Sequence, residues 1–78
     1  MKPTIEDVKD RLADRESHFL FDYNGKHCGV DPISRNKYNL WFGEKHSHVT
    51  NAEAVFEVPF WGGKRLPEIY DSITINAY

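Results

Sequence analysis

The sequence predicts an α+β domain in two layers: an N-terminal helix, a three-stranded antiparallel β-meander and two short C-terminal helices. Three observations predict this fold class. Apolar residues recur at helical spacing near the N-terminus, aromatic segments with two-residue alternation occupy the middle of the chain, and two segments with helix-capping residues follow. At 78 residues the chain is expected to form one domain, residues 1–78.

An amphipathic helix is predicted over residues 5–14. Thr4 is a suitable N-cap, and an acidic residue follows it three positions later. Ile5, Val8 and Leu12 recur at spacings of three and four, so they form one apolar stripe that can pack on a sheet.

The meander is predicted from strands over residues 18–23, 26–31 and 37–42. An Asn-Gly pair at positions 24 and 25 joins the first two, because a type I′ turn requires positive φ at both central residues. Pro32 has no backbone N–H to donate, so we expect it to end the second strand.

The C-terminal third is predicted to be mostly helical. Residues 45–50 fit either a fourth short strand or a loop. Thr50, with a glutamate three positions later, forms a capping box for a short helix that Pro59 ends. A last helix is predicted from Pro67, and the tail, residues 74–78, is expected to be extended or frayed.

Composition argues against several classes of protein. A formal net charge of −2 does not favour general binding to nucleic acid. The single cysteine, Cys28, excludes an internal disulfide and fits a reducing compartment, so we expect a cytoplasmic protein. No apolar run approaches the roughly 20 residues of a membrane helix. No secretory signal is visible at the N-terminus, so no membrane partner is expected.

Histidine and cysteine residues offer a candidate metal site. His46 and His48 project to the same face of a strand, and Cys28 or His27 would complete a ligand set for Zn²⁺. No recognised metal-ligand spacing organises them, and two solvated histidines are the simpler interpretation. Cys28 beside a histidine can also be a nucleophile, but a cysteine within a strand is more commonly a small buried hydrophobe. We therefore expect neither a cofactor nor an enzyme.

Two further motifs have structural interpretations. Gly62-Gly63-Lys64 precedes a predicted helix, as a phosphate-binding loop does, but it lacks the spacing and the following hydroxyl of that loop. We interpret it as a connector in which the glycines supply positive φ. Asp22 and Asp31 flank the predicted hairpin and are interpreted as turn formers.

Aromatic residues are the stronger candidates for binding. In the strand over residues 37–42, Tyr38 and its alternate neighbours share one face and Trp41 takes the other. Helices cover one sheet face in a two-layer domain, so one of these aromatic sets is expected to look toward solvent unless long side chains shelter it. The segment of residues 59–67 adds another tryptophan and two cations. The predicted binding residues are Trp41, Tyr38, Trp61, Lys64 and Arg65.

Three motifs carry a resemblance to a known family: F-x-Y-x-G-K, G-V/I-D-P and an ending similar to P-F-F-x-G-K-S-L-x-E-I. Over roughly residues 19–73 the chain resembles short uncharacterised proteins of Gram-positive, Firmicutes-type bacteria. Two positions depart from the pattern. Gly62 replaces a polar residue, and Arg65 replaces a capping serine, which weakens the N-cap of the last helix by about 1 kcal/mol. The resemblance implies a fold and a bacterial host, without a particular activity. The matching positions are Phe21, Tyr23, Gly25, Lys26, Gly29, Val30, Asp31, Pro32, Pro59, Phe60, Gly63, Lys64, Leu66, Glu68 and Ile69.

These observations favour a small cytosolic protein that binds a protein partner, or itself, through the aromatic sheet face. The alternative is a small metal-binding or Cys/His enzyme module built from Cys28 and the histidines above. A less favoured interpretation is nucleic-acid binding through stacked aromatics together with Lys37, Lys64 and Arg65.

Overall fold

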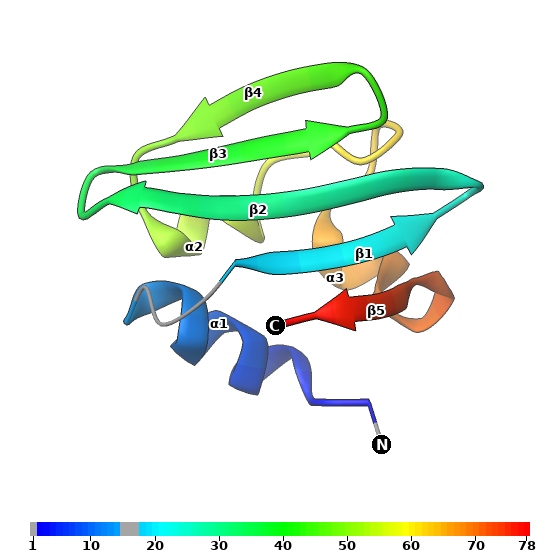
Figure 1. The fold of residues 1–78 in the computed structure, drawn as a ribbon, viewed down its shortest axis with the longest axis horizontal. Helices are drawn as coiled ribbons and strands as arrows, with labels where there is room; N and C mark the ends of the chain where they lie inside the picture. Colours follow the sequence, from blue (N-terminus) through cyan, green and yellow to red (C-terminus); the bar gives the residue numbers. More distant parts are fainter. Residues whose placement is uncertain (1, 15–17) are drawn as a thin grey trace.

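A five-stranded antiparallel sheet with helices on one of its faces forms the domain (Figure 1). The computed structural model describes residues 2–14 and 18–78. The strand order is β4-β3-β2-β1-β5, so the predicted α+β class is confirmed while the three-stranded meander is incomplete. In chain order the elements are α1 (Ile5–Ala13), β1 (Phe19–Tyr23), β2 (Lys26–Ser34), β3 (Lys37–Phe42), β4 (Lys45–Val49), α2 (Ala52–Val55), α3 (Leu66–Ile69), the 3₁₀ helix η1 (Tyr70–Ser72) and β5 (Thr74–Ala77).

Helix α1 begins at the predicted cap. The Thr4 hydroxyl accepts a hydrogen bond from the backbone N–H of Asp7 at 3.2 Å, which satisfies one of the free donors of the first turn. Val8 and Leu12 are buried, so the predicted apolar stripe is the face that packs on the core.

The β1–β2 hairpin has the predicted turn. Asn24 and Gly25 take φ values of 54° and 77°, the positive angles that a type I′ turn requires. The expected end of the second strand at Pro32 is wrong, because β2 continues to Ser34. The last pair between β1 and β2 is Phe19 with Val30, so Pro32 lies beyond the end of β1. No β1 residue pairs with Pro32, so the backbone N–H that proline lacks removes no hydrogen bond between β1 and β2.

Strand β3 has the predicted bounds, and residues 45–49 form the fourth strand that the sequence left open. The tail is a fifth strand, β5, paired with β1 through Phe21 and Ile75. The segment of β5 is short and uncharged and alternates only weakly, so its sequence gives little indication of a strand. Its pairing with β1 decides its structure.

The two C-terminal helices are single turns. Asn51, rather than Thr50, caps α2: its side-chain oxygen accepts from the backbone N–H of Ala54 at 2.8 Å. α3 has a proline in its first turn, as expected, but it begins at Leu66 and gives way to η1 at Tyr70.

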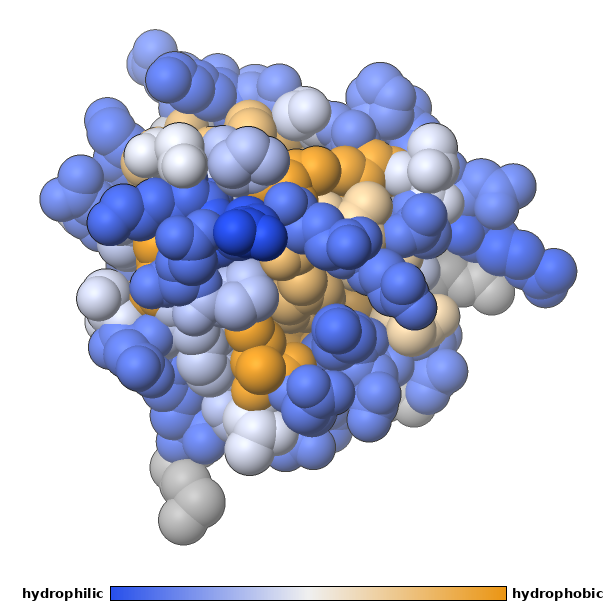
Figure 2. All heavy atoms as spheres, turned by 180° about the vertical axis from the view of Figure 1, so that it is seen from behind, coloured by the Kyte–Doolittle hydropathy of each residue, from blue (hydrophilic) through white to orange (hydrophobic). Residues whose placement is uncertain are grey.

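The core lies between the helices and one sheet face. Phe19, Phe21, Val30 and Leu40 supply the sheet side, each at most 1 % exposed. From the helix side, apolar atoms are visible between hydrophilic side chains, so these short helices leave parts of the core layer at the surface (Figure 2). Within the described part of the chain, none of the helices has the length and apolar character to span a membrane.

Candidate functional site

One face of the sheet has no helix over it (Figure 1). Its positions alternate along the strands with the buried ones, which point to the helices. We call this surface the open face. Its positions are Leu20, Asp22, His27, Gly29, Asp31, Lys37, Asn39, Trp41, His46 and His48.

Trp41 is the largest side chain of the open face. It lies in β3 directly opposite Gly29 of β2, with His46 of β4 on its other side. A Cβ built on Gly29 would lie 2.2 Å from Cζ2 of the indole and 2.6 Å from Cη2. The indole therefore covers the backbone of Gly29, and Trp41 remains half-buried rather than enclosed.

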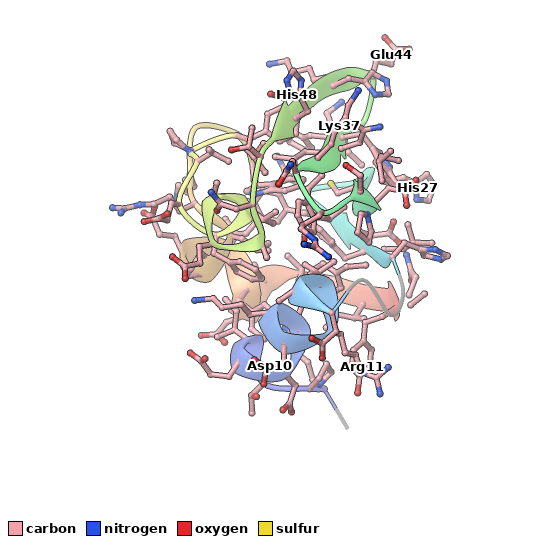
Figure 3. All side chains as sticks on the ribbon, turned by 90° about the vertical axis from the view of Figure 1, so that its left-hand side faces the viewer. Asp10, Arg11, His27, Lys37, Glu44 and His48 are labelled. Atoms are coloured by element: carbon pink, nitrogen blue, oxygen red, sulfur yellow. The ribbon has the colours of Figure 1, made fainter. Side chains whose placement is uncertain are left out.

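The side chains of Asp22 and His27 are joined by a hydrogen bond near the β1–β2 turn. The Asp22 Oδ1 and His27 Nδ1 atoms are 2.6 Å apart, and His27 projects from the sheet on the side away from the helices (Figure 3). A side-chain hydrogen bond from Asn76 and then the bond to His27 lower the pKa of the Asp22 carboxyl from its usual value. The carboxylate is thus held in place by two neighbouring strands.

A polar row crosses the other end of the open face. Asp31 pairs with Asn39, and Asn39 pairs with His48. A hollow of about 290 Å³ lies at the β3–β4 end of this row, lined by Lys37, Asn39, Leu40, His46, Ser47 and His48. Trp41 is therefore flanked by groups that donate or accept hydrogen bonds, which is the composition of a polar rim around an aromatic contact.

The structure buries two of the predicted binding residues. Tyr38 points to the helix side and is 3 % exposed, and its hydroxyl donates to the carbonyl of Leu12 at 3.1 Å. Trp61 is fully buried. The centre of its ring lies 5.2 Å from the ring centre of Phe21 and 4.9 Å from that of Phe60, both in edge-on contacts. Both aromatics therefore hold the core together and present almost no surface to a partner.

Lys64 and Arg65 are exposed, as expected, but they lie outside the sheet. Lys64 exchanges backbone hydrogen bonds with Trp61 across a tight turn in which Gly62 and Gly63 have φ values of 66° and 82°. Arg65 donates its backbone N–H to Glu68 at 3.0 Å and its side-chain Nε to the same oxygen at 3.2 Å. The backbone bonds of Lys64 therefore close the turn, and the bonds between Arg65 and Glu68 stabilise the first turn of α3.

The proposed Cys/His cluster does not assemble. Cys28 is buried on the helix side, whereas His27, His46 and His48 belong to the open face. Across residues 2–14 and 18–78, no three His, Cys, Asp or Glu side chains are grouped to hold a metal ion. Burial raises the pKa of the Cys28 thiol from 9.0 to about 11, which disfavours the thiolate that a nucleophile requires.

Comparison with known proteins adds no relative from which to transfer a role. Searches against protein-family models, curated proteins and solved structures find no significant match.

Sequence reasoning missed Gly29 as part of the site. A glycine inside a strand marks a close approach by another group, and this signal was present between Cys28 and Val30. The tryptophan that makes the approach lies 12 positions away in the chain, so only the β2–β3 register brings the two together.

Proposed function

We propose that the protein binds a protein partner through the open face, with Trp41 as the central contact. A half-buried tryptophan in the middle of a sheet face without helices carries this proposal. Tryptophan is enriched among the residues that dominate binding energy, and this one packs over the backbone of Gly29. A cytosolic setting in a Gram-positive bacterium is part of the proposal, supported by the resemblance and by the lone, buried thiol of Cys28.

The charges of the open face favour a partner that brings a lysine or arginine to Trp41. Asp22 and Asp31 supply two carboxylates, while Lys37 is the one lysine or arginine among the open-face positions, at the start of β3. A cation over the free side of an indole gains cation–π energy, and nearby carboxylates add Coulombic attraction. The same carboxylates repel phosphates, so this face favours a protein over a nucleic acid.

The test is quantitative capture from a lysate of the source organism by immobilised wild type and matched variants. Trp41→Ala removes the central contact, Trp41→Phe retains a ring, and Asp31→Lys reverses one charge of the open face. Glu57→Lys makes the same charge change at an exposed position after α2 and is the control. Circular dichroism establishes that each variant is folded.

The proposal predicts a protein that wild type and Glu57→Lys retain, that Trp41→Phe retains in part, and that Trp41→Ala and Asp31→Lys lose. Retention of every captured protein by folded Trp41→Ala contradicts it. If the NMR signals of open-face amides shift with concentration in the purified protein alone, the open face binds a second copy of the chain and not a different protein. Selective shifts of the His46 and His48 amides at stoichiometric Zn²⁺ would favour the metal-binding alternative.

A further inference from the structure

Strand β5 forms one edge of the sheet. It pairs with β1, and no described strand lies on its other side. Alternate backbone N–H and C=O groups of an edge strand point outward and can pair with another chain. Edges are usually protected by charges or proline, and the opposite edge, β4, carries Lys45 and two histidines. β5 reads Thr-Ile-Asn-Ala, without a charge or a proline.

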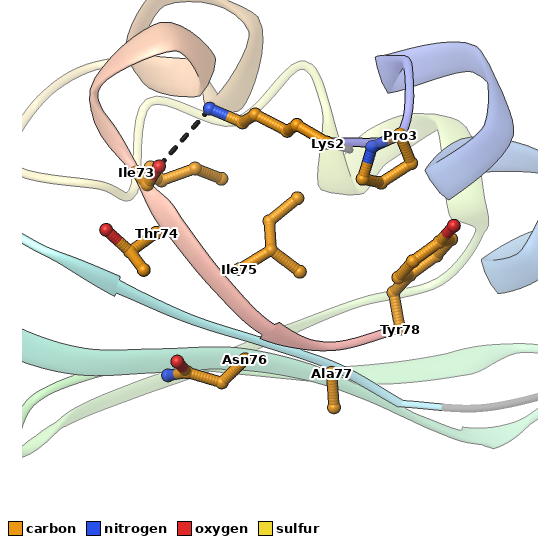
Figure 4. Close-up of a pocket in the computed structure, with 8 residues that line it drawn as sticks. All are labelled: Lys2, Pro3, Ile73, Thr74, Ile75, Asn76, Ala77 and Tyr78. Carbon is orange, nitrogen blue, oxygen red and sulfur yellow. Dashed lines mark hydrogen bonds between the residues drawn. The ribbon is translucent and has the colours of Figure 1, made fainter.

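A hollow of about 470 Å³ lies against this edge. It is lined by Lys2, Pro3 and residues 73–78, and Ile75 points into it toward Lys2 and Pro3 (Figure 4). Ile75 is half-buried, so part of its side chain remains available for contact. The hollow is large enough for an apolar side chain from an added strand.

The N-terminal segment forms a fixed wall of this hollow. The Lys2 ammonium donates to the carbonyl oxygens of Tyr70 and Ile73, the latter at 3.2 Å, and lies 4.7 Å from the centre of the Tyr70 ring. The Tyr70 hydroxyl donates to the carbonyl of Pro3 at 2.5 Å. These contacts hold Lys2 and Pro3 against η1, so the hollow persists beside β5.

A second hollow, which shares the lining residue Tyr78 with the first, is acidic. It has a volume of about 310 Å³. Its other lining residues are Asp7, Asp10 and Arg11 of α1 and Asp14 directly after this helix, three carboxylates against one guanidinium. Arg11 is already engaged, since its guanidinium lies 4.9 Å from the centre of the Tyr78 ring. Figure 3 places Asp10 and Arg11 on α1, at the end of the molecule next to β5.

We propose that β5 and these two hollows bind an extended peptide segment of a partner protein as a sixth, antiparallel strand. Its backbone pairs with the free edge, an apolar side chain packs on Ile75, and a lysine or arginine two residues earlier lies beside Asp10 and Asp14. Strand addition with side-chain pockets at alternate positions is a recurring mode of peptide recognition. A second copy of β5 contains no basic residue for the acidic hollow, so the charges favour a different chain.

The test titrates ¹⁵N-labelled protein with a synthetic seven-residue peptide, TKTVTVT, blocked at both ends. Its lysine and valines share one face of a strand, with the lysine two residues before the central valine. We expect shifts confined to the amides of residues 74–78 and of the hollow, and slower hydrogen exchange of the outward β5 amides. A peptide with glutamate in place of lysine should bind at least about fivefold more weakly, because the same carboxylates then repel it.

Variants of the protein give the matched controls. Ile75→Lys should abolish the shifts, whereas Ser47→Lys, which adds the same charge to the exposed opposite edge, should retain them. Asp10→Lys at the exposed surface of α1 should weaken binding of the lysine peptide even if Ile75→Lys fails to fold. Trp41→Ala should leave this binding unchanged, which separates it from the open face.

Three results would overturn the proposal. The first is the absence of shifts in β5 at millimolar peptide, and the second is shifts that map to β4 or the open face. The third is concentration-dependent broadening of the β5 amides without peptide, which would assign the edge to a second copy. Equal affinity for the lysine and glutamate peptides would overturn the role of the acidic hollow.

Discussion

The indole of Trp41 lies over the backbone of Gly29, its direct cross-strand neighbour, and occupies the space that a side chain at position 29 would need. This contact ties together the features of the open face. Because Gly29 has no side chain, the large indole ring of Trp41 can lie flat along β2. The ring in turn covers backbone that would be exposed at a glycine. The candidate binding residue and the local stability of the sheet therefore depend on the same pair.

The first prediction concerns this pair. Gly29→Ala should destabilise the fold by about 1–3 kcal/mol, because the new Cβ would lie 2.2 Å from Trp41 Cζ2 and the rigid ring must move. Urea denaturation followed by circular dichroism measures the change. The open face should also change, so tryptophan fluorescence of the folded variant should shift toward that of a more exposed indole.

A double-mutant cycle isolates the contact. In a Trp41→Ala background the space over position 29 is empty, so the added methyl group of Gly29→Ala should cost much less than in wild type. Additive free energies in the two backgrounds would show that the steric contact with Trp41 is not the cause.

The second prediction concerns the attachment of α1 to the sheet. The Tyr38 hydroxyl is buried and donates to the carbonyl of Leu12, so Tyr38→Phe removes that bond. We expect a loss of about 1–2 kcal/mol. Hydrogen exchange should quicken in α1 more than in β2 and β3, since the bond joins α1 to β3.

Tyr23→Phe is the matched control for that experiment. Tyr23 is half-buried, and its hydroxyl makes no hydrogen bond within residues 2–14 and 18–78. A cost for Tyr23→Phe equal to that for Tyr38→Phe would mean that the effect comes from the phenol in general and not from the bond to Leu12.

The parts of the fold that were predictable carry local signals. The Thr4 cap, the stripe of Val8 and Leu12, and the turn at Asn24 and Gly25 all depend on residues close in sequence, and each has the predicted conformation. β5 depends on pairing with β1, which is more than 50 residues away in the chain, and no local pattern encodes that contact.

The candidate site was predictable only in part, for the same reason. Alternation within β3 correctly separates Trp41 from Tyr38, but it cannot tell which of the two faces the helices. Trp61 was among the predicted binding residues, as part of a segment with two glycines and two cations. The positive φ angles of Gly62 and Gly63 instead reverse the chain and direct the ring into the core.

The third prediction concerns Cys28. Burial raises its thiol pKa to about 11, so the folded protein should react only slowly with a disulfide reagent at pH 8. The rate should rise in urea in proportion to the unfolded fraction, and it should rise likewise in variants that destabilise the fold, such as Tyr38→Phe. Fast labelling of the folded protein at a rate independent of stability would contradict the burial of the thiol and revive a role in chemistry.

The last prediction concerns acid stability and the Asp22 carboxylate. Because Asn76 and His27 lower its pKa from the usual value in the folded state, the ionised form stabilises the fold. That contribution is fully present above the pKa of the unfolded chain and is lost as the pH falls through the folded pKa. Asp22→Asn should therefore flatten the dependence of unfolding free energy on pH between about pH 2 and 5. The pKa of Glu68 is lowered by the backbone N–H of Arg65. Glu68 should therefore account for a separate part of the pH dependence of the unfolding free energy, and Glu68→Gln should remove that part.

The origin of the Asp22 shift can be assigned by carboxyl ¹³C titration. The hydrogen bond from Asn76 is the largest single cause, and His27 adds both a hydrogen bond and a Coulombic attraction, so Asn76→Ala and His27→Ala should each raise the pKa of Asp22. Asn76 belongs to β5 and His27 to β2, which lie on opposite sides of the strand that carries Asp22. A larger effect of His27→Ala would mean that the carboxylate is held chiefly by the hairpin and only weakly by the edge strand.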